Sequence, residues 1–468
     1  MRQIALITLL TTVGLGQSST APDWQKIQDE TLRHFQALVR FDTSDPPGNE
    51  KQAADYLKQV LEAEGIPVEV VALEPHRPNV IARLKGTGAK RPLLLMAHTD
   101  VVNVDPRKWT HPPFSATSEG GYIYGRGTVD DKDNVVAALM VMLTLKRQNV
   151  PLDRDVIFLA EAGEEGSTRV GIQYVVQHHF PKVDAEFCLA EGAGVTRQGG
   201  KVKFATVQTL EKIPRGIELT ARGPAGHGSV PLRSSAIVHL ANAVGRVAAW
   251  KPPVRLNEIT RAYFRRLASI STPEEAKRYL DVLSSDPKKV DAADEYFLDN
   301  EPRHASMLRT SVSPNIIQAG YRINVIPSDA KATLDVRVHP DDDHVAFMEQ
   351  VKKVINDPAI EVTWAQRDVR PGTGSATLGT VGFKAVEAMV TKHYDGVVTL
   401  PTMSTGATDM AYLRAKGIQC YGIGPATDIE DGPKGFGAHS DQERILEAEL
   451  HRFVRFHYDI VELLARRQ

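Results

Sequence analysis

The spacing of apolar residues along the chain predicts helices and strands that alternate through its first half. Apolar residues recur with helical spacing in some segments and form short runs, typical of buried strands, in others. The helical segments are residues 24–39, 51–65, 134–147 and 170–178. The strand segments are residues 68–73, 79–84, 92–100 and 156–163. This alternation predicts a layered α/β domain whose sheet is mostly parallel.

The pattern changes near Leu210 and indicates a second folding unit. Strand and helix patterns follow at 216–223, 235–250, 315–327, 331–340 and 343–355. A charged helical insertion interrupts them at 261–300, and a further helix is predicted at 380–393. A chain of 468 residues is too long for one ordinary core. We therefore expect a first domain over 22–211 and 369–468, and a compact α+β domain inserted over 212–368.

Composition narrows the class of protein. Charged residues make up 24% of the chain and the formal net charge is -2, so no bias toward nucleic acid or an anionic membrane is expected. Apolar residues at 42% and a mean hydropathy of -0.25 fit a soluble globular protein. The two cysteines, Cys188 and Cys420, lie in apolar segments and are interpreted as small core residues rather than a disulfide scaffold.

The N-terminus predicts a secretory signal over residues 1–16. Arg2 precedes an apolar stretch at 4–15, which is shorter than the ~20 residues that a spanning helix needs. Gly14-Leu15-Gly16 offers a small-x-small cleavage pattern. The expected location is therefore secreted or periplasmic, and the alternative is an uncleaved membrane anchor. No later segment is long and apolar enough to cross a bilayer.

Acidic and imidazole side chains follow the predicted strands where each strand ends. The residues at these ends are His98, Asp100, Glu164, Glu165 and Glu191. Two others lie in glycine-framed segments, Asp130 in GRGTVDDKDN ahead of a helix and His439 in GFGAHSDQER. Ligands of open α/β sheets bind outside the carboxyl ends of the strands. One edge of the sheet can therefore gather these residues.

Two imidazoles and three carboxylates can hold two divalent metals, with one carboxylate shared and Glu164 left free to activate water. Such a metal pair lowers the pKa of bound water to about 7 and polarises a substrate carbonyl. Oxygen and imidazole ligands suit Zn²⁺ and tolerate Co²⁺ or Mn²⁺. Asp100, two residues beyond His98, is placed to accept the proton of the other ring nitrogen. The pattern is that of a hydrolase site.

Each of these signals alone has an ordinary structural explanation. A His-x-Asp at a strand end is usually a buried pair, a Glu-Glu pair is usually solvated, and an Asp before a helix is usually an N-cap. Their common position at strand ends favours the metal interpretation. A serine nucleophile is disfavoured because the chain has no GxSxG elbow, and neither a P-loop nor a paired-cysteine zinc signature occurs.

Several motifs resemble the M20 metallohydrolases, a family of glutamate carboxypeptidases, aminoacylases and succinyl-diaminopimelate desuccinylases. The motifs are HTDVV (98–102), GRGTVDDK (125–132), EAGEEGS (161–167), LAEGAG (189–194), GHGSVP (226–231) and GAHSDQE (437–443). They occur in the family's order and are most similar to its secreted and vacuolar carboxypeptidase branch. The resemblance implies a three-layer, zinc-exopeptidase-like catalytic domain of α/β class. It also implies that the inserted α+β domain is a dimerisation or lid domain, and hence a homodimer.

The resemblance also implies roles for the residues at the strand ends. One metal takes His98 and Glu191, the other takes Glu165 and His439, and Asp130 bridges them. Glu164 is then the general base that removes a proton from water and delivers it to the leaving nitrogen. The cofactor implied is a pair of Zn²⁺ ions.

Substrate contacts are implied outside the metal centre. His227 in GHGSVP would reach the substrate oxyanion, often in a neighbouring subunit's site, and Asn324 and Arg337 would contact the substrate. Thr405 and Gly406, in the segment STGATDM that also holds Asp409, match a carboxylate-binding loop. The alternatives are that His227 is a turn residue and that Arg337 forms a salt bridge on a strand surface.

Three features depart from the family's pattern. Asp133 stands where many relatives have glycine, and the insertion at 261–300 is larger than in compact members. The second departure puts the dimer geometry, and with it the role of His227, in question. Glutamate rather than aspartate at position 191 leaves the choice among the family's activities open.

The sequence therefore predicts a dinuclear metallohydrolase that cleaves an amide bond adjacent to a free carboxylate, as a carboxypeptidase does. One alternative is an N-acyl-amino-acid hydrolase with the same chemistry and a different acyl pocket. A non-catalytic metal-binding scaffold is a distant alternative, because such a scaffold has no use for the unligated Glu164. The expected partner is a peptide or N-acyl amino acid, with no nucleic acid and no membrane beyond the signal segment.

Overall fold

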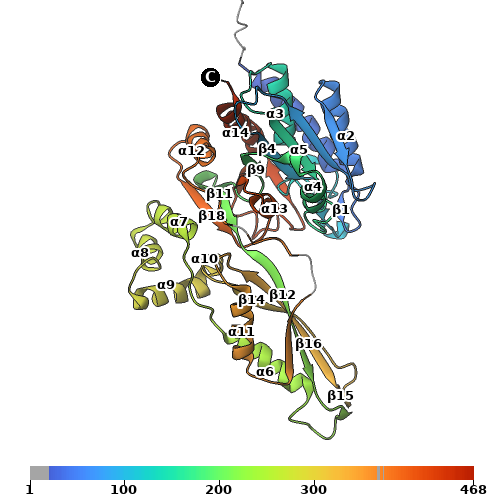
Figure 1. The fold of residues 1–468 in the computed structure, drawn as a ribbon, viewed down its shortest axis with the longest axis vertical. Coiled ribbons are helices and arrows are strands. Elements are labelled where there is room, and N and C mark those ends of the chain that lie inside the picture. The colour runs from blue at the N-terminus through green and yellow to red at the C-terminus, as the bar shows by residue number, and fades with distance from the viewer. Residues whose placement is uncertain (1–20, 366–368, 373, 468) are drawn as a thin grey trace, which may run out of the picture.

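The computed structural model describes residues 21–365, 369–372 and 374–467. The predicted signal segment lies outside these residues. Figure 1 shows two bodies. One is built on a large sheet and corresponds to the predicted catalytic domain, so we call it the catalytic body. The second body is elongated, extends away from the first and is called the lid. Among the described residues, no helix has the length and apolar character needed to cross a membrane.

The large sheet has ten strands in the order β2-β3-β8-β4-β9-β19-β11-β10-β20, with β18 beside β11. Its strands in chain order are β2 Val68–Val71, β3 Asn79–Leu84, β4 Leu93–His98, β8 Val156–Glu161, β9 Phe187–Ala190, β10 Val195–Gln198, β11 Lys201–Glu211, β18 Thr399–Ser404, β19 Gln419–Gly422 and β20 Ala426–Asp428. The predicted parallel pairing holds at the centre, from β8 through β4 and β9 to β19. The flanks are antiparallel at β2–β3, β3–β8, β19–β11 and β11–β10, so the sheet is mixed.

Both faces of the central strands are buried, which makes the domain three-layered. On β4, Leu93 and Leu95 join one core, while Leu94 and Met96 join another. Successive side chains of a strand point to opposite faces, so a continuous apolar run needs helices on both sides. The helices of the first core are α1 Trp24–Arg40, α2 Lys51–Ala63, α3 Lys132–Arg147, α12 Val381–His393 and α14 Glu447–Ala465. Those on the opposite face are α4 Ile172–His178, α5 Phe180–Val183 and α13 Met410–Arg414.

Small sheets complete the loops above the large one. They are formed by β1 Ser44–Asp45 with β5 Val101–Val102, and by β6 Thr117–Glu119 and β7 Tyr122–Tyr124 with β21 Arg444–Leu446, while a short 3-10 helix covers Pro106–Lys108. Cys188 and Cys420 are buried and unpaired, which confirms their interpretation as core residues.

The second body is a four-stranded antiparallel sheet in the order β14-β16-β12-β17, covered by two helices. Its elements are β12 Ile213–Arg222, α6 Ala236–Ala249, β14 Ser311–Ala319, β16 Asp329–Val338, α11 His344–Ile355 and β17 Ile360–Trp364. Residues such as Leu219, Leu334 and Val351 form a separate core. The predicted strand over 315–327 divides into β14 and β15 Val325–Ile326, because the chain turns at Gly320 with φ 64°. β15 pairs with β13 Gly226–His227 at the far tip of this body (Figure 1).

The helical insertion packs against the catalytic sheet rather than on the core of the second body. Its helices are α7 Glu258–Ala268, α8 Pro273–Asp281, α9 Pro287–Asn300 and α10 Pro302–Met307. Capping boxes begin α7 at Asn257 and α8 at Thr272. Phe264 and Phe297 share a core with Leu400 of β18. The chain between residues 212 and 365 therefore contributes two parts, the lid sheet with its two helices and a helical wall on the catalytic body.

Candidate metal centre

The carboxyl ends of three adjacent parallel strands position most of the candidate centre. His98 is the last residue of β4, Glu191 directly follows β9, and Glu164 and Glu165 follow the end of β8 by a tight turn. Gly163 makes this turn with φ 75°, where a Cβ atom would lie 2.4 Å from the carbonyl oxygen of Ser167. The sheet therefore brings these side chains to one edge, as expected from their position in the sequence.

Two loops add Asp130 and His439 to the same edge, and Glu443 joins them. A Glu443 carboxylate oxygen lies 2.5 Å from Arg126 Nη1, and the other accepts the backbone N–H of Val129 at 2.9 Å. Arg126 also donates to the carbonyl oxygen of Ser440 at 2.7 Å. Arg126 and Glu443 are both buried, so this contact fixes the Asp130 loop relative to the His439 loop. Glu443 was not predicted as a positioning residue, although it closes the GAHSDQE motif.

The five predicted ligands form two groups that share one carboxylate. The ligand atoms of His98, Asp130 and Glu191 all lie within 4.8 Å of one another, and so do those of Asp130, Glu165 and His439. Asp130 Oδ1 lies 3.2 Å from His98 Nε2, and Oδ2 lies 3.0 Å from His439 Nε2. One oxygen of Asp130 thus faces each group, which is the arrangement that a bridging ligand requires.

The charges of this region fit a pair of cations. Burial raises the pKa of Glu191 well above its ordinary value, and the charge of Glu164 raises it further. Burial likewise raises the pKa of Asp131, next to Asp130, to about 8. Acids crowded together in this way repel one another unless positive charge is placed among them. The donor set contains only carboxylate oxygens and imidazole nitrogens, and it suits Zn²⁺, Co²⁺ or Mn²⁺.

Asp100 orients the site through two kinds of contact. The His98 Nδ1 atom lies 3.0 Å from the backbone carbonyl oxygen of Asp100 and 3.5 Å from its carboxylate. The carboxylate accepts the backbone N–H groups of Glu164 at 3.1 Å and Glu165 at 2.9 Å. Its carbonyl is therefore nearest the ring nitrogen, and its carboxylate holds the turn that carries the two glutamates.

Glu164 lies beside the two groups of ligands and belongs to neither. Its carboxylate accepts from Arg370 Nη2 at 2.6 Å, and Arg370 Nη1 lies 3.0 Å from Asp409. Burial raises the pKa of Glu164, whereas the Arg370 charge lowers it. Arg370 was missed by the sequence analysis, because its only signal is a basic residue just before a Pro- and Gly-containing stretch between the domains.

The loop that contains Thr405 and Gly406 follows β18 and reaches the centre through Asp409. The Gly406 N–H donates to Ser404 Oγ at 3.1 Å, and Asp409 lies 1% exposed beside Arg370. The Asp409–Arg370–Glu164 chain of contacts therefore links this loop to the proposed base.

His227 and Asn324 lie far from the centre of the same chain. They are neighbours in the β13–β15 hairpin, where the Gly228 N–H donates to the Asn324 carbonyl oxygen at 2.9 Å (Figure 1). His227 is exposed and contacts Ser229 Oγ at 2.7 Å. Arg337, near the end of β16, pairs with Asp335 at 3.0 Å, as in the alternative interpretation of a strand salt bridge.

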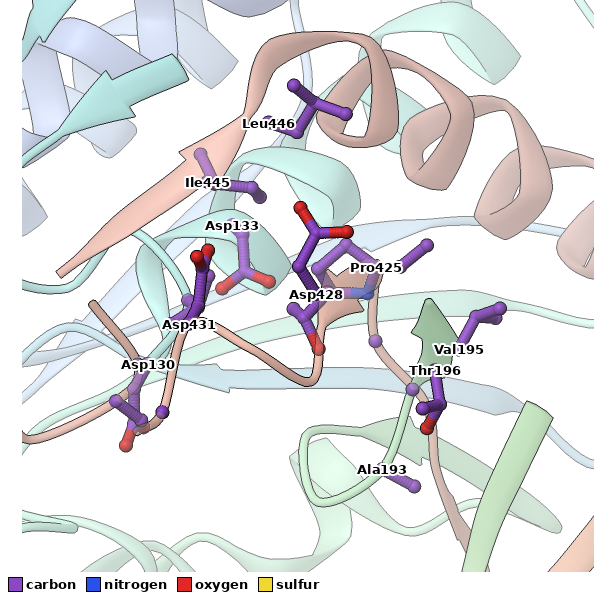
Figure 2. A pocket seen from close by; sticks show the side chains of 18 of the residues that line it. Asp130, Asp133, Ala193, Val195, Thr196, Pro425, Asp428, Asp431, Ile445 and Leu446 are labelled. Atoms are coloured by element: carbon purple, nitrogen blue, oxygen red, sulfur yellow. The ribbon is translucent and has the colours of Figure 1, made fainter. Parts of the chain in front are cut away.

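A cavity of about 470 Å³ opens beside Asp130 and Glu191 (Figure 2). Acidic side chains line it, among them Asp133, Asp428 and Asp431. Both carboxylate oxygens of Asp133 are buried without a hydrogen-bond partner among the described residues. Burial raises the pKa of Asp133 well above its ordinary value. The departure from glycine at this position therefore places a protonatable group in the wall of the cavity.

Comparison with known proteins connects this geometry to one family. Residues 94–463 match the family described as Peptidase family M20/M25/M40. The "Probable carboxypeptidase S-like 2" of Dictyostelium discoideum is 31% identical over 327 residues, which are 68% of this chain and 62% of that protein. The human "N-fatty-acyl-amino acid synthase/hydrolase PM20D1" is 27% identical over 384 residues, which are 80% of this chain and 74% of that protein. The chain thus spans less than two thirds of the first relative.

Solved structures share the fold. The M20 family metallo-carboxypeptidase Sso-CP2 from Sulfolobus solfataricus superposes with a TM-score of 0.71 at 22% identity, over 93% of this chain and 99% of that chain. This likeness confirms the predicted fold, an α/β domain with an inserted α+β domain.

We predict that binding of cations to this centre releases protons. Hydrogen bonds to Asp130 and Glu165 raise the pKa of His439 to about 10, so the imidazole carries a proton at neutral pH. A cation that binds Nε2 must displace this proton, and Zn²⁺ affinity should therefore rise with pH toward that value. Calorimetry in buffers of different ionisation enthalpy measures the protons released.

The His439→Gln variant should release about one proton fewer per chain than the unaltered protein. His76→Gln, which changes an exposed histidine outside the centre, is the control. Equal release by all three proteins would show that His439 is not a ligand.

Proposed function

Because this chain belongs to Peptidase family M20/M25/M40, we propose that it is a two-metal hydrolase that cleaves an amide bond next to a free carboxylate, as a carboxypeptidase does. Its membership makes it a hydrolase, as predicted. The observation that carries the two-metal proposal is the pair of ligand groups that meet at Asp130. The presence of Glu164 beside them, outside both groups, supports catalysis over a metal-binding scaffold.

The proposed ligands fall into the same two groups as the clusters of ligand atoms in the structure. His98 and Glu191 would hold one cation, Glu165 and His439 would hold the other, and Asp130 would contact both. Two cations, Zn²⁺ in the proposal, supply a Lewis acid for the amide carbonyl and lower the pKa of nearby water. Asp100 supports this set by fixing His98 and the Glu164–Glu165 turn.

Glu164 transfers the proton in the proposed reaction. Its carboxylate takes a proton from water as the oxygen attacks the carbonyl carbon, and delivers that proton to the nitrogen as the C–N bond breaks. The products are a carboxylate and a free amine. Arg370 stabilises the ionised form of Glu164, which must be ionised before it accepts a proton.

The second candidate function is hydrolysis of N-acyl amino acids. The similarity to a protein described as an N-fatty-acyl-amino acid synthase/hydrolase, over 80% of this chain, favours it. The bond broken and the free carboxylate beside it are the same in both functions. The two differ in the group on the carbonyl side of the amide.

We further propose that a homodimer completes the substrate site. His227 and Asn324 are exposed at the tip of the lid, where a second subunit can receive them. β14 is an edge strand of the lid sheet, and its Ile316 and Ile317 are 50% and 59% exposed. Such an edge can pair with a second copy.

Arg337, Thr405 and Gly406 are proposed to bind the substrate carboxylate. A secreted or periplasmic location remains the prediction from the N-terminal segment.

A substrate panel tests the proposed function. The protein, supplied with Zn²⁺, Co²⁺ or Mn²⁺, is assayed on dipeptides, on the same dipeptides with an amidated C-terminus, and on acetyl- and long-chain acyl-amino acids. We expect cleavage of the free dipeptides and little cleavage of the amides, because the site recognises a carboxylate. Activity on acylated amino acids alone would defeat the peptidase proposal and favour the second candidate.

Replacement of the proposed base separates catalysis from metal binding. Glu164→Gln should lower kcat by ~10²–10⁴-fold, because the amide cannot accept the proton. Bound metal, measured by elemental analysis, should stay near that of the unaltered protein. Glu349→Gln, on the exposed face of α11, is the matched control. Retained turnover in Glu164→Gln would remove the proposed role.

Mixing two inactive variants tests the contribution of a second subunit. If His227 acts in the partner's site, a mixed dimer of Glu164→Gln and His227→Ala contains one intact site. Random exchange of subunits should then restore about a quarter of the unaltered activity. If His227 acts within its own chain, no mixed dimer has an intact site, and activity no greater than the sum of the two variants contradicts the proposal.

A further inference from the structure

A second cavity lies beside the one at the metal centre. We call the cavity lined by Asp130 and Glu191 the metal-side cavity, and the second the aromatic cavity. The aromatic cavity also measures about 470 Å³, and the insertion helices form its outer wall. Tyr263 and Leu267 of α7 and Tyr279 of α8 line it, opposite Phe204 of β11.

The two cavities adjoin. The residues that line both are Thr196, Thr206, Arg303, Thr427 and Ile429. A group that enters from the metal centre past Glu191 therefore meets the aromatic cavity next. The aromatic cavity lies between the large sheet and the wall of insertion helices, and Arg303 of that wall also lines the metal-side cavity. The proposed carboxylate-binding residue Arg337 is on the lid.

Four polar side chains of the helical wall, Tyr263, Tyr279, Glu301 and His304, contact one another. The Tyr263 hydroxyl lies 3.0 Å from His304 Nε2, and the Tyr279 hydroxyl donates to Glu301 at 3.3 Å. His304 Nδ1 contacts the same Glu301 oxygen. With these hydrogen bonds made inside the wall, the rings and the Leu267 side chain are left to contact a ligand. Such a surface favours apolar groups.

We propose that the aromatic cavity binds the apolar chain on the carbonyl side of the scissile amide, so that the enzyme acts on amino acids carrying a medium or long acyl chain. This inference rests on the proposed function, because the chain must extend from an amide held at the metal centre. The acyl chain passes Arg303 and Ile429 and ends among the rings of α7 and α8. The insertion that departs from compact family members thus determines the substrate.

An acyl series measures the effect. The substrates are N-acetyl-, N-hexanoyl-, N-dodecanoyl- and N-succinyl-phenylalanine. Burial of each added methylene is worth about a fourfold gain at most, so kcat/KM should rise by ~10-fold or more from acetyl to dodecanoyl. The succinyl substrate, which carries a second carboxylate, should be cleaved no better than the hexanoyl substrate.

Two variants block the cavity from opposite walls. Leu267→Trp fills it from α7, and Ile429→Trp fills it from the exposed segment after β20, where a larger side chain does not disturb a core. Each should lower the ratio of kcat/KM for the dodecanoyl substrate to that for the acetyl substrate by ~10-fold, because the block lies on the path of the longer chain. Ile270→Trp, at a 40% exposed position just beyond α7 and outside the lining, is the control. Binding of dodecanoate, measured by calorimetry, should weaken in the same two variants and remain in the control.

The outcomes separate this proposal from the function on which it rests. If no dipeptide or acyl amino acid is cleaved, the proposed function fails. If acetyl and dodecanoyl substrates are cleaved equally well and the blocking variants change neither, the proposed function stands and the acyl pocket is overturned. A preference for the succinyl substrate that Arg303→Met abolishes would also overturn it, because the junction would then select an anion.

Discussion

The arrangement of the candidate metal centre depends on Asp130, because its two carboxylate oxygens face two different imidazoles. His98 lies 3.2 Å from one oxygen and His439 lies 3.0 Å from the other. A carboxylate shared in this way would contact both cations of a two-metal hydrolase, which in such enzymes lie ~3.5–4 Å apart. The arrangement also gathers many acids in a buried place, which is unfavourable unless positive charge offsets them. Arg126, buried beside Glu443, and Arg370, partly buried beside Glu164, supply part of that charge, and the proposed cations would supply the rest.

The large sheet meets this constraint because strands far apart in the sequence end side by side. β8, β4 and β9 are parallel neighbours, so the residues that follow them emerge at one edge. The remaining ligands come from loops, and their positions depend on ion pairs rather than on strands. The helical insertion packs on the same catalytic body and lines the aromatic cavity beside the centre. Chemistry and acyl selection are thus proposed to reside in one rigid body, and carboxylate recognition in the lid.

Much of the fold and most of the candidate ligands could be predicted from the sequence, and the exceptions share a physical reason. Apolar periodicity reveals a helix or strand and its buried face, so β4 and α3 were predicted. It does not reveal which other element that face packs against or which strand lies beside it. For that reason the antiparallel flanks of the sheet and the packing of α7 on β18 were not foreseen. Arg370 contacts Glu164, which is 206 positions away in the sequence. Glu443 contacts Val129 and Arg126, which are 314 and 317 positions away. No local sequence pattern marks such contacts. His227 and Asn324 were assigned by resemblance alone, and within one chain they lie apart from the candidate metal ligands.

The most direct test of the account is anomalous diffraction at the zinc absorption edge from crystals grown with Zn²⁺. The account predicts two peaks in each chain, one among His98, Asp130 and Glu191 and the other among Asp130, Glu165 and His439. Each peak should lie at a coordinating distance from a different oxygen of Asp130. A single peak, or two peaks that do not share Asp130, would contradict the central claim.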